Sequence, residues 1–321
     1  MKYVFSIKDI STYRAELMGW SILWIMMLHF TFTQIQPLGF IAQYGFAGVD
    51  VFMLVSGFGL YHSLEKNDNI LYFYGKRLLR IFPTYYLIGI FHSLLISHDS
   101  FLTYLYRYTT LGFWTNGIYW GWYIPSLIVL YLFAPIFKKM FTGNLFPVLG
   151  TFMACCWILA YILIDREDII DRSHFFLLYR IPAFIFGMVC AYWVKKRASP
   201  RYFLYILLAG IPLFAILFPH HHQVYNYKYF SLAFLLPFFT LVFLLISKHI
   251  IFINPIISVI GKASLEIYLI QGLFFTAILR GLLQINPAWH DMTTILLIIV
   301  STIMGIIVHW LIDKIGILRL L

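Results

Sequence analysis

The stretch LMGWSILWIMMLHFTF, residues 17–32, decides the fold class of this chain. Its only titratable side chain is His29, and a membrane span needs about 20 mainly apolar residues, most of which this run supplies. In the whole chain of 321 residues, 62% are hydrophobic and 11% are charged. Soluble domains carry about 25% charged residues. The sequence therefore predicts an all-α, polytopic membrane protein.

Apolar runs of this kind recur along the chain. The sequence shows no internal repeat, and no large soluble segment separates the apolar runs. Residues 1–321 are therefore expected to form one membrane domain. We expect about ten membrane-spanning helices, at residues 17–36, 44–63, 81–97, 121–137, 145–164, 175–194, 202–218, 229–247, 264–283 and 292–313.

Basic residues are distributed unevenly among the predicted loops. Most of the 23 Lys and Arg residues fall on the side of the N-terminal segment, for example in residues 66–80 and 195–201. Because Lys and Arg accumulate in cytoplasmic loops, both termini are predicted to face the cytoplasm. This asymmetry and contact with anionic membrane lipids explain the net charge of +10 better than nucleic-acid binding does.

His29 lies near the outer end of the first predicted span. A titratable group is costly in hydrocarbon, which makes it a functional candidate. A neutral imidazole could take a proton from an acceptor hydroxyl. On one continuous helix Arg14 and His29 are about 60° apart around the axis and about 22 Å apart along it, so they share one broad side. The alternative is that His29 only forms a hydrogen bond to a neighbouring helix.

A basic cluster precedes the third predicted span. On a helix Lys76, Arg77 and Arg80 form one cationic face, and the arginine fork suits phosphate groups. The rule that places basic residues in cytoplasmic loops would also put them here. The cluster by itself leaves both interpretations open.

Three further charged residues fall inside predicted spans. Asp50 lies in the second span beside several glycines, which allow close approach of helices. It must pair with another group or line a wet cavity, and Arg180 in the sixth span is a candidate partner. Glu266 lies in the ninth span. The cysteines show no metal-ligand spacing, and no metal cofactor is expected.

Six stretches occur in the chain in a characteristic order. They are MGWSILWIMMLHF (18–30), GFAGVDVFMLVSGF (45–58), FYGKRLLRIFPTYY (73–86), WYIPSLIVLYLFAPI (122–136), RIPAFIFGMVCA (180–191) and GKASLEIYLIQ (261–271). Together they resemble the acyltransferase 3 family of integral-membrane O-acyltransferases, which modify bacterial surface glycans and antibiotics.

The resemblance implies an acyl-CoA donor, by default acetyl-CoA, and a glycan or lipid-linked sugar as the acceptor. It also implies a place in the bacterial plasma membrane. His29 matches the family's catalytic histidine, which acts as a base or as a transient acyl carrier. Arg77 and Arg80, with Lys76 beside them, match the Arg-x-x-Arg pair that handles the donor. Asp50 matches the Asp of the family's "GVD-F" stretch.

The chain departs from the family pattern at two places. The family usually has an arginine eleven residues before the histidine, where this chain has Met18; Arg14, about 40° away on the helix, could replace it. The ninth-span motif often ends in His, where this chain has Gln271 and an added Glu266. No soluble esterase-like domain is expected. A transporter or flippase for a lipid-linked glycan, or an altered scaffold of a glycan-assembly complex, remains an alternative.

Overall fold

The computed structural model describes residues 5–67, 69–116, 121–141, 145–166, 172–222 and 226–315. Within these ranges the regular elements are helices and there is no β-strand, which confirms the all-α prediction. The longer helices are α2 (Arg14–Phe30), α4 (Ala47–Lys66), α5 (Ile70–His92), α8 (Tyr123–Lys139), α9 (Phe146–Ile162), α11 (Ile181–Lys195), α12 (Arg201–Leu217), α14 (Leu236–His249), α16 (Ser264–Leu279) and α17 (His290–Lys314). The shorter ones are α1 (Asp9–Thr12), α3 (Gln36–Ala42), α6 (Phe101–Tyr108), α7 (Leu111–Asn116), α10 (Arg172–Leu178), α13 (Asn226–Leu232) and α15 (Asn254–Lys262).

Fewer helices than the ten predicted are both long enough and apolar enough to cross a membrane. Among the described residues, six helical segments qualify, and a seventh does if α15 and α16, bent by 71°, form one broken span. Each of the ten predicted ranges holds a helix, but several of these helices are short. Helix α2 ends at Phe30 instead of residue 36, because Thr31 has a positive φ of 56° and cannot continue it. The protein is an integral membrane protein, while ten spans and the sidedness of the termini stay predictions.

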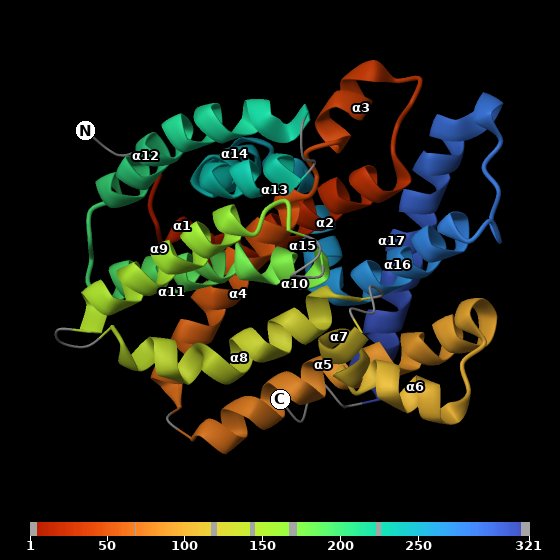
Figure 1. The fold of residues 1–321 in the computed structure, drawn as a ribbon, viewed down its shortest axis with the longest axis horizontal. Helices are drawn as coiled ribbons and strands as arrows, with labels where there is room; N and C mark the ends of the chain where they lie inside the picture. The colour runs from red at the N-terminus through yellow and green to blue at the C-terminus, as the bar shows by residue number, and fades with distance from the viewer. Residues whose placement is uncertain are drawn as a thin grey trace.

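Helices α4 and α11 form the buried centre of the bundle. In Figure 1 they lie between α12 and α14 along one edge and α5 and α8 along the other. Glycines set the close approach of the two helices. A Cβ on Gly57 would collide with the carbonyl oxygen of Phe184, and one on Gly187 with that of Leu54. Only glycine fits where two helix backbones meet in this way.

A second close contact holds α2 against α15. A Cβ on Gly19 would collide with the carbonyl oxygen of Ile257, and one on Gly261 with that of Ala15. The chain then bends at Ala263, and α16 packs against α2, α5 and α17. This bend places the first turn of α16, which carries Glu266, beside the N-terminal half of α2.

Candidate functional site

Two cavities lie at successive levels of the described helix bundle. One encloses about 610 Å³, and Arg14, Lys76, Arg77, Arg80 and Lys262 are among its walls; we call it the cationic cavity. The other encloses about 900 Å³ and is lined by residues that include His29, His92 and Gln271; we call it the histidine cavity. Helices α2, α5 and α16 contribute residues to both cavities: on each of these helices one part lines the cationic cavity and another part lines the histidine cavity.

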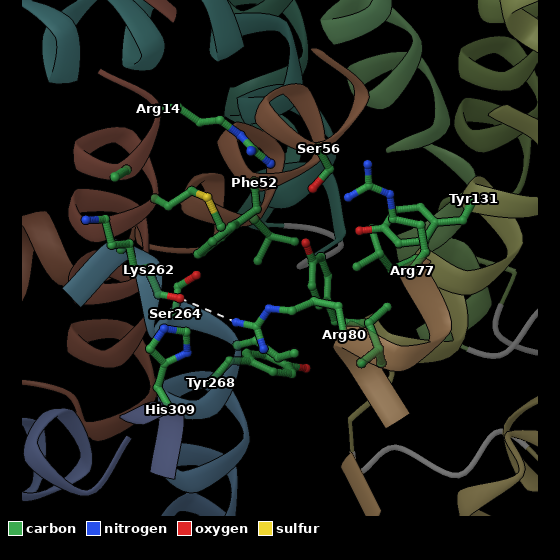
Figure 2. Close-up of a pocket in the computed structure, with 18 of the residues that line it drawn as sticks. Arg14, Phe52, Ser56, Arg77, Arg80, Tyr131, Lys262, Ser264, Tyr268 and His309 are labelled. Atoms are coloured by element: carbon green, nitrogen blue, oxygen red, sulfur yellow. Dashed lines mark hydrogen bonds between the residues drawn. The ribbon is translucent and has the colours of Figure 1, made fainter. Parts of the chain in front are cut away.

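The predicted cationic cluster gathers around one space together with Arg14. Arg14 comes from the first turn of α2, and Lys76, Arg77 and Arg80 come from the first half of α5. In Figure 2 the guanidinium groups of Arg14 and Arg77 point toward each other near Ser56, while Arg80 points toward the side of Lys262 and His309. The structure therefore joins the N-terminal arginine to the Arg-x-x-Arg pair.

Arg80 is anchored by Glu266. Its Nη1 donates to Glu266 Oε1 at 2.6 Å and its Nη2 to Oε2 at 3.2 Å, with a longer bond of 3.4 Å to the Lys262 carbonyl oxygen. Glu266 is fully buried, and its Oε2 also lies 3.3 Å from Nδ1 of His309. A bidentate carboxylate fixes the direction of an arginine as well as its place. Glu266 thus holds Arg80 in the cavity wall.

Arg77 and Arg14 have no such carboxylate. In the described part of the chain no acidic oxygen lies within 4.0 Å of either guanidinium. Nε of Arg77 is buried without a hydrogen-bond partner among the described residues, and its guanidinium carbon lies 5.6 Å from the centre of the Phe73 ring. Arg14 rests against α4, where a Cβ on Gly59 would lie 3.0 Å from Nη2. Both positive charges are therefore available to an anion.

His29 projects from the last turn of α2 into the histidine cavity. Nδ1 of His29 lies 2.7 Å from Oε1 of Gln271 on α16, and its ring stacks on Phe275 with the ring centres 4.7 Å apart. An amide oxygen only accepts hydrogen bonds, so Nδ1 donates and Nε2 is left as an acceptor. The side chain is partly accessible from the cavity. This is the protonation pattern that a general base requires.

Tyr268 separates the two cavities. Its side chain lines both of them, and its ring packs on Tyr123 with 5.4 Å between the ring centres. On α2 the change from one cavity to the other falls within one helical turn, between Ile25 and Leu28. A molecule that fills the cationic cavity therefore ends next to the ring that bounds the space around His29.

Asp50 and Arg180 form a buried ion pair. Oδ1 of Asp50 lies 3.0 Å from Nε of Arg180, and both side chains are excluded from solvent. The pairing suggested from the sequence is thus present, but neither residue lines the cationic cavity or the histidine cavity. The guanidinium carbon of Arg180 lies 4.2 Å from the centre of the Phe46 ring and 5.2 Å from that of Trp122. Because both rings line the histidine cavity, the ion pair supports its wall from behind.

Three residues of the two cavities were not singled out from the sequence. His309 carries the same signal as His29, a titratable group inside an apolar helix, and could have been found by it. His92 lies inside the third predicted span and carries this signal too. Tyr268 carries none, since the sequence has 23 tyrosines and nothing distinguishes the one between the cavities.

The sequence comparisons now identify the family. The sequence model of the acyltransferase 3 family, an acyltransferase domain, matches residues 17–314. The chain belongs to the acyltransferase 3 family. The matched range includes His29, Arg77, Arg80 and Glu266, and it begins three residues after Arg14.

One curated relative of this acyltransferase 3 protein is a viral protein. It is named "Putative acetyltransferase ORF330", comes from Acidianus two-tailed virus, and is 26% identical over 180 residues, which are 53% of this chain and 52% of the relative. The chain thus spans about half the length of the curated relative it matches. No solved structure matches.

Proposed function

We propose that the protein is a membrane O-acetyltransferase that moves an acetyl group from acetyl-CoA in the cationic cavity to a glycan hydroxyl in the histidine cavity. The observation that carries the proposal is the meeting of the two cavities at Tyr268, next to His29. A transferase that brings together a charged donor and a polar acceptor inside a bilayer needs one pocket for each. Membership of an acyltransferase family favours this function over that of a transporter or a scaffold.

Acetyl-CoA suits the cationic cavity because its nucleotide end carries phosphate groups. Arg14 and Arg77 offer guanidinium groups without carboxylate partners among the described residues, and Arg80 is held in place by Glu266. Arginine binds phosphate through two parallel hydrogen bonds. With the phosphates on these residues, the thioester end of the donor would extend between α2 and α16 toward Tyr268.

His29 would supply the base. As the acceptor oxygen attacks the thioester carbon, Nε2 takes its proton, the carbon–sulfur bond breaks, and the thiolate of CoA recovers the proton from the imidazolium. Gln271 holds Nδ1 throughout, so that Nε2 faces the reaction. A route in which Nε2 first carries the acetyl group uses the same atom. We place the protein in the bacterial plasma membrane, with the cationic cavity open to the cytoplasm, where CoA is available.

The test uses purified protein in lipid nanodiscs. We would measure equilibrium binding of desulfo-CoA, and CoA release from acetyl-CoA with a bacterial envelope glycan extract as acceptor. His29→Ala should bind desulfo-CoA as wild type does and release CoA at least about 100-fold more slowly, the usual contribution of a general base. Lys139→Gln removes a positive charge outside both cavities and should change neither measurement.

Two results would contradict the proposal. Absence of saturable desulfo-CoA binding to the wild-type protein would favour the transporter or the scaffold. An unchanged rate of CoA release from His29→Ala would remove His29 from the chemistry.

A further inference from the structure

The histidine cavity has a one-sided charge. Its charged wall residues are Arg107 from α6 and Arg280 at the end of α16, and two histidines, His29 and His92, add basic groups. Among the described residues no Asp or Glu lines this cavity. A cavity that receives a neutral sugar needs no arginine in its wall. The excess of positive charge in the wall therefore suggests that the molecule bound there is negatively charged.

Arg107 is built into the wall by a polar network. Its Nη2 donates to Asp99 Oδ1 at 3.1 Å, and Asp99 also accepts a bond of 2.6 Å from the Ser97 hydroxyl. The hydroxyl of Tyr108 lies 3.0 Å from Nδ1 of His92, which places that ring on the same wall. Nε of Arg107 is buried and has no hydrogen-bond partner among the described residues. Asp99 thus neutralises the charge of Arg107, while the Nε–H group of Arg107 remains an unused hydrogen-bond donor among the described residues.

Arg280 lies at the rim and has no acidic partner. Its Nη1 donates to the carbonyl oxygen of Ile96 at 2.9 Å, which fixes the side chain against the π-helical turn Ser93–Ser97 that follows α5. In the described chain no carboxylate oxygen lies within 4.0 Å of it. The residue is exposed yet lines the cavity, so its charge faces both solvent and the cavity interior.

The rest of the cavity wall suits a sugar. Trp122, Phe176 and Tyr229 present aromatic rings, on which the apolar face of a sugar ring can pack. Gln43 adds an amide, whose Oε1 accepts a hydrogen bond of 3.0 Å from Lys228. An aromatic wall, a base at one end and an arginine at the rim together describe a site for a glycan that carries a negative charge.

We infer that the acceptor is an anionic glycan whose phosphate or carboxylate group binds at Arg280 and Arg107 while one of its hydroxyls reaches His29. The inference rests on the proposed function, because it takes the histidine cavity to be the acceptor site. It adds the chemical class of the acceptor, which the family membership leaves open.

The test compares three sugars of the same ring configuration: glucose, glucuronic acid and glucose 6-phosphate. Binding of each is measured by calorimetry to wild-type protein in uncharged phosphatidylcholine nanodiscs. Saturating desulfo-CoA occupies the cationic cavity, so that the anions cannot bind there. At least one anionic sugar should bind about tenfold or more tightly than glucose, which is about 1.4 kcal/mol. The order of the two anions tells a phosphate site from a carboxylate site.

Arg280→Gln should remove most of this preference and leave desulfo-CoA binding unchanged, which also shows that the variant is folded. Lys139→Gln is the matched control and should keep the preference. Equal binding of the three sugars, or none, overturns the anionic acceptor while the donor site stands. A parallel series in nanodiscs that contain phosphatidylglycerol tests the lipid alternative: the anionic acceptor is also overturned if Arg280→Gln weakens only the binding of this anionic lipid, since Arg280 would then contact a headgroup. Failure of wild type to bind desulfo-CoA overturns the proposed function and this inference together.

Discussion

Nδ1 of His29 lies 2.7 Å from Oε1 of Gln271, although the two residues are 242 positions apart in the chain. The amide oxygen fixes both the tautomer and the direction of the imidazole. The family often has a histidine at the position of Gln271, and both side chains can accept a hydrogen bond from Nδ1. The departure noted in the sequence therefore preserves the contact that the proposed base requires.

Replacing Gln271 should slow the reaction without weakening donor binding. Gln271→Leu removes the acceptor for Nδ1; the partners that orient metal-binding histidines are typically worth about 10–100-fold in affinity or activity, and we expect a comparable effect here. We expect a loss of that size in CoA release with unchanged desulfo-CoA affinity. Gln271→His can accept the same hydrogen bond and should retain most of the rate. A Gln271→Leu protein as fast as wild type would show that His29 needs no orienting partner.

Arg77 and Arg80 should respond differently to the same substitution. Arg77→Gln removes a guanidinium with no carboxylate partner in the described chain, so desulfo-CoA affinity should fall while thermal stability is kept. Arg80→Gln should lower both, because it leaves the buried Glu266 without its arginine. Losing the partner of a buried carboxylate costs about 1–3 kcal/mol, discounted here because the Arg80 side chain is 27% exposed. Thermal midpoints and binding isotherms of the two variants, measured side by side, decide this; equal midpoints would be inconsistent with the anchoring role of Glu266.

The place of Arg14 can be tested through the glycine it rests on. Gly59→Leu puts a side chain where Nη2 of Arg14 lies, and should displace that guanidinium and weaken desulfo-CoA binding several-fold. Gly75→Leu is the matched control, since no atom lies within 4 Å of a Cβ placed there, and it should bind normally. Combining Gly59→Leu with Arg14→Gln should cost no more than Arg14→Gln alone, because both act on one interaction. Additive losses would argue for an effect of Gly59 on packing instead.

The buried Asp50–Arg180 pair should show strong non-additivity in stability. Asp50→Leu or Arg180→Met alone leaves one uncompensated charge in the core, which costs about 3–5 kcal/mol. The double variant Asp50→Leu/Arg180→Met removes both charges and should recover much of that loss. Thermal unfolding of the four proteins in detergent forms the double-mutant cycle. If the double variant is as unstable as the sum of the single ones, the pair does not act as a unit.

Much of the fold was predictable because composition and the length of apolar runs are local signals. Each predicted span contains a helix, and the glycines around Asp50 indicated the close approach that Gly57 and Gly187 permit between α4 and α11. The end of α2 at Phe30 was not predictable, since the apolar run continues past it. Neither was the bend of 71° at Ala263, because Gly261, two residues before it, also serves the close contact with α2 and does not by itself indicate a bend.

The candidate site was predictable as a set of residues, and much less so as an arrangement. A charged or titratable group in an apolar run is conspicuous, which is how His29, Asp50 and Arg180 were found. Which groups meet depends on contacts between helices far apart in the sequence. The sequence therefore indicated the basic cluster of α5, but not that Glu266 from α16 would bind Arg80, or that His309 would lie on the other side of that carboxylate.

The position of Tyr268 between the two cavities also bears on how well the protein blocks ions from crossing the membrane. Where two cavities approach each other inside a bilayer, the barrier to ions is only as thick as the wall between them. Tyr268 lines both the cationic cavity and the histidine cavity. The proposed transfer requires a thin wall, whereas the electrical potential across the membrane requires one that ions cannot cross. A bulky aromatic ring packed against Tyr123 meets both requirements, and we expect a small residue in its place to let the two cavities merge.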